Sequence, residues 1–174
     1  PTADHPAPAS AGGCAVQIVE LTDSRRAPET LGSLANFRSI QAPPDREAWL
    51  RSIFEVGMAA RGFKVSFAPA GAEAAPGAVT ARIRLQAVWI STPAMNKAGS
   101  AVLRMNAAPS GAPLGPERVY RGDQTGLNWA GSTSEFNGLL DRVFADALDA
   151  MAADLRPLCP SGSSSAPPPP TATP

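Results

Sequence analysis

Residues 79–90 read VTARIRLQAVWI, and this stretch decides the fold of the chain. Apolar residues occupy every second position up to Trp89, while Arg82 and Arg84 stand between them. A period of two is typical of a β-strand with one buried face. We therefore expect the apolar set, including Trp89, to point toward the core and the two arginines to point away from it.

A second strand follows with the same alternation. Residues 100–106 read SAVLRMN, with Arg104 between apolar neighbours. The segment STPAMNKAG at 91–99 predicts a hairpin loop between the two strands. Three further short segments also predict strands, namely residues 15–21, 63–67 and 117–122.

Two amphipathic helices are expected from apolar residues at helical spacing. The first begins after Asp45, a natural N-cap, and ends at Gly62. The second begins after Ser132, whose spacing to Glu135 fits a capping box, and ends at Pro157.

The order of elements is then strand, helix, four strands, helix. Strands joined by hairpins are antiparallel, and two helices with one apolar face each can cover only one side of a sheet. The sequence therefore predicts a two-layer α+β fold, with a mostly antiparallel sheet of about four to five strands and both helices on one face. Residues 22–44 are expected to be irregular.

The two ends of the chain differ in composition from its middle. Residues 1–13 are rich in Pro, Ala and Gly, and residues 160–174 contain four consecutive prolines among serines. Such segments bury too little apolar surface to offset the entropy of ordering them. We expect a flexible tether at 1–13, a single domain at 14–159 and a disordered tail at 160–174.

The two cysteines stand at the borders of the expected domain. Cys14 precedes the first apolar run and Cys159 follows the last. This placement favours a disulfide that joins the first strand to the end of the last helix, which implies an oxidising compartment. Two unrelated reduced thiols in a cytosolic protein are the alternative.

Charge and residue types exclude several classes of function. The 15 basic and 15 acidic residues give a net charge of zero, which disfavours a protein that coats nucleic acid. The single histidine, His5, lies in the expected tether, so neither a catalytic triad nor a zinc site is expected on the domain. We therefore predict no enzyme activity, no metal and no cofactor. The sequence has no membrane span, and an exported form would have lost its signal peptide before Pro1.

Two surfaces could bind a protein partner. Arg82, Arg84 and Arg104 are expected on the sheet face away from the helices, where arginine suits bidentate binding of carboxylates or phosphates. Leu127 and Trp129 lie in a glycine-rich loop at 120–131, and an exposed tryptophan there could anchor a partner. The alternatives are a solvated sheet face and a tryptophan that plugs the end of the domain.

Four short motifs resemble the periplasmic lipoprotein domains of the YajG-like and ABC-transport auxiliary families. They are VELTDSR at Val19–Arg25, ARGF at Ala60–Phe63, YRG at Tyr120–Gly122 and the final helix from Glu135. The resemblance implies a non-enzymatic accessory domain that faces the envelope, works beside a transporter or assembly and is tethered by a lipid. This chain departs from the families in its bracketing cysteine pair and in lacking a lipidated cysteine at its start.

The function predicted from these observations is that of an exported accessory or structural protein. It would dock on a bacterial envelope protein complex for transport, secretion or surface assembly, through the sheet face or the 120–131 loop. Its place would be the periplasm or the cell envelope, with an anchor in the outer membrane through a lipid outside this chain, and self-association is left open. The alternative is a periplasmic carrier of a lipid or other apolar molecule held between helices and sheet.

Overall fold

The computed structural model describes residues 13–34, 38–69, 75–92, 96–127 and 132–160. Within these ranges the chain forms seven strands and two α-helices. The strands are β1 (Cys14–Asp23), β2 (Thr30–Ser33), β3 (Ser39–Gln41), β4 (Phe63–Phe67), β5 (Val79–Ser91), β6 (Asn96–Ala108) and β7 (Arg118–Leu127). The helices are α1 (Arg46–Ala59) and α2 (Thr133–Leu155), followed by a short 3-10 turn, η1 (Arg156–Leu158).

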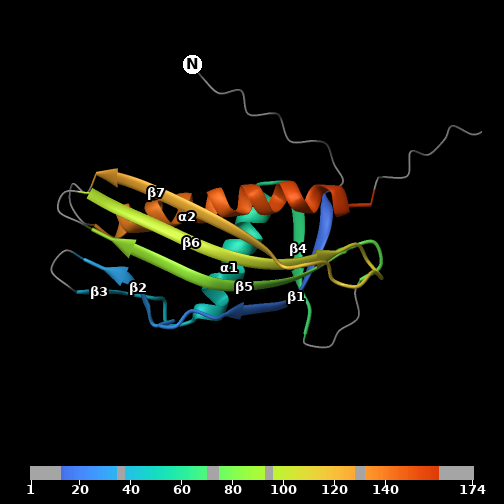
Figure 1. The fold of residues 1–174 in the computed structure, drawn as a ribbon, viewed down its shortest axis with the longest axis horizontal. Helices are drawn as coiled ribbons and strands as arrows, with labels where there is room; N and C mark the ends of the chain where they lie inside the picture. Colours follow the sequence, from blue (N-terminus) through green and yellow to red (C-terminus); the bar gives the residue numbers. More distant parts are fainter. Residues whose placement is uncertain (1–12, 35–37, 70–74, 93–95, 128–131, 161–174) are drawn as a thin grey trace, which may run out of the picture.

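All seven strands belong to one mixed sheet in which β5 is central (Figure 1). One edge of β5 pairs with β6 antiparallel, and β6 pairs with β7 antiparallel. The other edge of β5 pairs in parallel with β1 along one half and with β2 along the other. Strand β4 extends the sheet beyond β1, and β3 extends it beyond β2. The expected α+β class is confirmed, with more strands than the sequence predicted.

The additional strands β2 and β3 lie in the segment that was expected to be irregular. They contain only four and three residues, so neither is long enough to show a period. Gly32 allows β2 to reach β5, because its φ is +144° and a Cβ there would lie 1.9 Å from the Ile90 carbonyl oxygen. Only glycine fits such a backbone approach without displacement.

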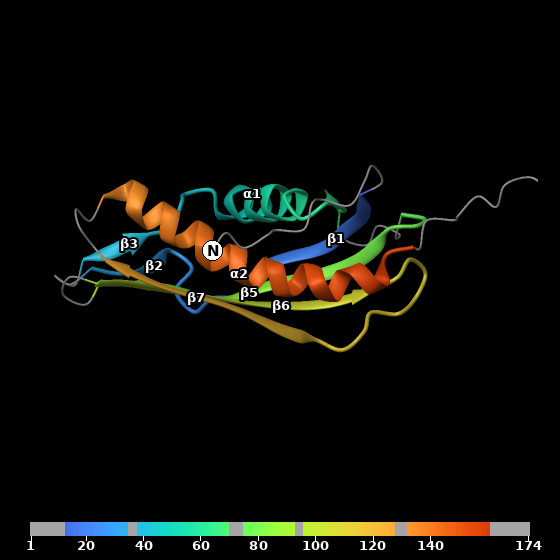
Figure 2. The same ribbon diagram turned by 90° about the horizontal axis from the view of Figure 1, so that it is seen from above.

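Both helices pack on the same face of the sheet (Figure 2). Helix α1 begins as predicted, since the Asp45 carboxylate accepts a hydrogen bond from the Ala48 backbone N–H at 2.9 Å. The expected capping box is also present, with reciprocal bonds between Ser132 and Glu135 at the start of α2. Among the described residues, no helix has the length and hydropathy that a bilayer-spanning segment requires.

The space between sheet and helices is filled by close-packed apolar side chains. Ile83 and Leu85 from β5 and Leu103 from β6 are almost completely buried there, as the alternation predicted. The fully buried side chains from the helices include Phe54 and Leu139. A ligand held between helices and sheet, as the carrier alternative requires, would have to displace these residues.

A disulfide joins Cys14, at the start of β1, to Cys159, just after η1. The two Cα atoms are 5.7 Å apart, although 145 positions separate them in sequence. The two ends of the domain are therefore fixed side by side.

Candidate docking surface on the open sheet face

The face of the sheet that the helices leave open carries all three arginines predicted for it. Their side chains project from the middle of β5 and β6 and are between one third and one half exposed. Arg84 and Arg104 are direct cross-strand neighbours in the β5–β6 ladder. Two like charges in that position would destabilise the sheet without a counter-ion.

Glu117 supplies the counter-charge from the residue before β7. Its two carboxylate oxygens pair with the guanidinium groups of Arg84 and Arg104, the latter at 2.5 Å. The hydrogen bond from Arg104, followed by that from Arg84, holds the pKa of Glu117 below its ordinary value of 4.5. Sequence reasoning missed Glu117 because nothing local indicates that it lies opposite two other strands.

A second ion pair extends the cluster, since Arg82 lies 2.6 Å from Glu20 on β1. Next to the cluster, Val119 is opposite Arg104 in the β6–β7 ladder and is 56% exposed. The cluster therefore has three positive and two negative side chains next to the exposed apolar side chain of Val119. We call Arg82, Arg84, Arg104, Glu20, Glu117 and Val119 the arginine surface.

The expected inward orientation of Trp89 is wrong. The β5–β6 register shifts between Leu85 and Ala87, which is the signature of a β-bulge. Beyond a bulge the alternation of faces is reversed. Val88 is consequently buried, and Trp89 projects from the open face with half of its surface exposed.

Trp89 forms one wall of a shallow hollow of about 370 Å³ on this face. The row across three strands is Trp89 on β5, Ser100 on β6 and Asp123 on β7. Arg121 lies beside Asp123 and pairs with it at 2.5 Å. We call this the Trp89 hollow, and its lining residues are Trp89, Ser91, Ala98, Gly99, Ser100, Arg121, Asp123, Gln124 and Thr125.

The 120–131 segment is mostly strand rather than the loop that was expected. Strand β7 continues to Leu127, which is 55% exposed at its end. The three glycines of this segment favour a loop in the sequence, but Gly122 is required for packing, because a Cβ there would lie 1.8 Å from the Val143 carbonyl oxygen of α2. Trp129 lies outside the described residues.

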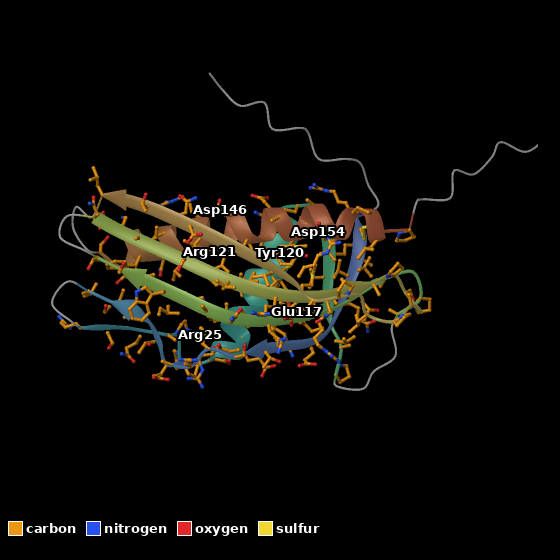
Figure 3. All side chains as sticks on the ribbon, viewed as in Figure 1. Arg25, Glu117, Tyr120, Arg121, Asp146 and Asp154 are labelled. Carbon is orange, nitrogen blue, oxygen red and sulfur yellow. A yellow bond between two sulfur atoms is a disulfide. The ribbon has the colours of Figure 1, made fainter. Side chains whose placement is uncertain are left out.

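Asp154 on α2 is not the simple solvated residue that the helix pattern suggests. Its Oδ2 accepts hydrogen bonds from the Tyr120 hydroxyl at 2.8 Å and from Arg118 Nη1 at 2.9 Å (Figure 3). The bond from Arg118, followed by that from Tyr120, holds the pKa of Asp154 below its ordinary value of 3.8. These contacts fasten β7 to the last turns of α2.

A pH-dependent loss of stability is expected from Asp154. Since its folded pKa lies below the unfolded one, the carboxylate stabilises the fold above the unfolded pKa, and this contribution disappears as the pH falls through the folded value. Asp154→Asn should therefore lower the free energy of unfolding at neutral pH, and its difference from the wild type should shrink below about pH 4. Urea unfolding at a series of pH values measures this. Asp141→Asn, on the exposed side of α2, is the control, and a pH-independent effect of Asp154→Asn would contradict the assignment.

The described part of the chain contains no group of three or more His, Cys, Asp or Glu placed to hold a metal ion. The ion pairs of the open face join arginines to carboxylates and leave neither type of group isolated. The side chains exposed on this face offer charged groups, hydrogen-bond donors and acceptors, and apolar contact.

The chain is similar to solved structures of bacterial lipoproteins. Rare lipoprotein B from Shewanella oneidensis is 12% identical with a TM-score of 0.43, over 80% of this chain and 98% of that one. The minor lipoprotein from Acinetobacter baumannii is 10% identical with a TM-score of 0.42, over 79% and 92% of the two chains. No family model and no curated protein matches. The narrower resemblance to the YajG-like and ABC-transport auxiliary families stays a prediction.

Proposed function

We propose that this chain is an exported accessory protein of the bacterial cell envelope, and that it docks on an envelope protein complex through the arginine surface. Export is supported by the disulfide between Cys14 and Cys159, because disulfides persist in oxidising compartments. The complex would serve transport, secretion or surface assembly, as the resemblance to auxiliary lipoproteins implies. An N-terminal tether to the membrane would leave the domain free to reach this envelope complex.

One observation carries the docking proposal, namely that Arg84 and Arg104 share the single carboxylate of Glu117. Each guanidinium has five N–H donors, so one carboxylate cannot use them all. The pair keeps one positive charge, and charge-assisted bonds to a second carboxylate are among the stronger contacts available to an interface. A partner that offers Asp or Glu side chains fits this chemistry.

Val119 adds the apolar part of the proposed interface. Val119 is 56% exposed and lies next to Arg104. Because arginine is one of the residues that dominate binding energy at protein interfaces, a partner that contacts Arg104 would also cover Val119. Leu127 is exposed at the far end of the same strand. The interface could thus continue along β7 as far as Leu127, one of the residues in the second site that the sequence suggested.

Site-specific photo-crosslinking in living cells of the source bacterium tests this proposal. A photo-reactive amino acid in place of Val119 should capture one envelope protein in stoichiometric yield. The matched control is the same amino acid in place of Val56, which is 69% exposed but lies on α1, in the helical layer on the opposite side of the sheet. The capture should fall at least tenfold when Arg84→Glu and Arg104→Glu are combined with the probe, and Arg84→Gln should give a smaller loss.

Two outcomes would contradict docking through the arginine surface. Equal capture from both probe positions would indicate non-specific contact, and capture unaffected by the charge reversal would place the interface elsewhere. Thermal unfolding of each variant shows whether it is folded. Recovery of the protein with bound lipid and no protein partner would favour the carrier alternative.

A further inference from the structure

We infer that the Trp89 hollow binds a neutral sugar ring of a glycan. This site is separate from the arginine surface, and its ligand is of another class than the protein partner proposed above. The inference rests on three properties of the hollow, which are the exposed aromatic plane of Trp89, its balanced charge and its shape.

The first property is the exposed indole of Trp89. Half of its surface is in contact with solvent, on a sheet face where its cross-strand neighbour is the small residue Ser100. Burying so large a ring gives a substantial gain in free energy, and the packing of Trp89 within its own domain provides only part of it. A pyranose ring has a flat face of C–H groups that can cover an indole, and its hydroxyls project outward from the rim of that face.

The second property is charge balance. Arg121 and Asp123 pair with each other at 2.5 Å, and among the residues that the structure describes they are the only charged side chains that line the hollow. Their charges cancel, so neither an anionic nor a cationic ligand is favoured. The same pair offers N–H donors and carboxylate acceptors side by side. Hydroxyl groups on adjacent carbons of a sugar both donate and accept hydrogen bonds, so they can bind to Arg121 and Asp123 together.

The third property is shape. The central strand β6 contributes only small residues to the hollow, Ala98, Gly99 and Ser100, while larger ones rise from β5 and β7 on either side. The resulting volume of about 370 Å³ lies within the range of roughly 300 to 1,000 Å³ that is usual for small-ligand sites. Thr125 also lines the hollow and adds a polar residue to it.

Screening the full chain on an array of neutral and acidic glycans tests the inference, followed by affinity electrophoresis in gels containing the best soluble neutral glycan. We expect wild-type protein to bind neutral glycans and to be retarded in the gel. Trp89→Ala should lower the affinity at least tenfold, and Trp89→Phe should recover part of it, because a flat ring is restored. Val56→Ala, an exposed apolar residue on α1 in the helical layer, is the control and should bind as well as the wild type.

The inference is overturned if no neutral glycan binds, if acidic glycans bind better than neutral ones, or if Trp89→Ala leaves binding unchanged. Crosslinking from position 119 distinguishes a failure of the glycan inference from a failure of the docking proposal. Capture of a protein that persists in Trp89→Ala, together with lost glycan binding, supports two distinct sites. Loss of protein capture in Trp89→Ala without any glycan binding would assign Trp89 to the protein interface and reject the sugar site.

Discussion

Replacing Arg25 by alanine is expected to lower the free energy of unfolding by about 3 to 5 kcal/mol, the usual cost of removing one partner from a buried ion pair. Arg25 follows β1 and is only 8% exposed. Its guanidinium binds both carboxylate oxygens of Asp23, with Nε at 2.8 Å and Nη2 at 2.7 Å. Without Arg25, the largely buried Asp23 carboxylate would be left without its counter-charge.

Arg25 also holds the chain that connects β1 to β2. Nη1 donates to the Thr30 carbonyl oxygen at 2.8 Å, and Nη2 donates to the Pro28 carbonyl oxygen at 2.7 Å. The guanidinium lies 5.9 Å from the ring centre of Trp49 on α1, within the range of a cation–π contact. One side chain thus links β1, the following turn and the helical layer (Figure 3).

Urea unfolding followed by circular dichroism measures the effect, with Arg26→Ala as the matched control. Arg26 is the next residue in the chain and is exposed, so its loss should change stability by no more than about 0.5 kcal/mol. Arg25→Lys keeps the charge but cannot form the planar two-bond contact with Asp23, and we expect an intermediate loss. Equal stabilities for Arg25→Ala and Arg26→Ala would show that the Arg25 contacts contribute nothing to the fold.

The fold class could be predicted because its signals are local and repeated. The alternation in β5 and β6 and the caps at Asp45 and Ser132 each depend on residues within one element. The parallel pairing of β1 with β4 and β5 could not be predicted in this way. It depends on contacts between distant segments that leave no local pattern.

The candidate site was predicted only in part for the same reason. The alternation predicted the correct face for Arg82 and Arg84 because both precede the bulge in β5. It also predicted the correct face for Arg104, which is on β6. Trp89 lies beyond the bulge, so the same rule assigned it to the wrong face. A single extra residue in a strand reverses every later position, and a sequence pattern of period two has no means of marking it.

Removing the disulfide is expected to have the largest effect on stability. Cys14 and Cys159 close a loop of 145 positions, and the chain-entropy relation for a loop of that length gives about 5 kcal/mol. Small domains are stable by only about 5 to 15 kcal/mol in total, so Cys14→Ser combined with Cys159→Ser should leave this one close to unfolding. The urea midpoint of the double variant should fall accordingly.

The disulfide stabilises the fold mainly by restricting the unfolded chain. Chemical reduction of the wild type removes the same bond as the double substitution and serves as an internal control. Reductant should lower the urea midpoint of the wild type to that of the double variant, and it should leave the double variant unchanged. The slope of the transition should rise when the bond is absent, because an unconstrained unfolded chain exposes more surface. An unchanged midpoint in the double variant would mean that non-covalent packing alone holds the two ends together, and that the disulfide contributes nothing to the stability of the fold.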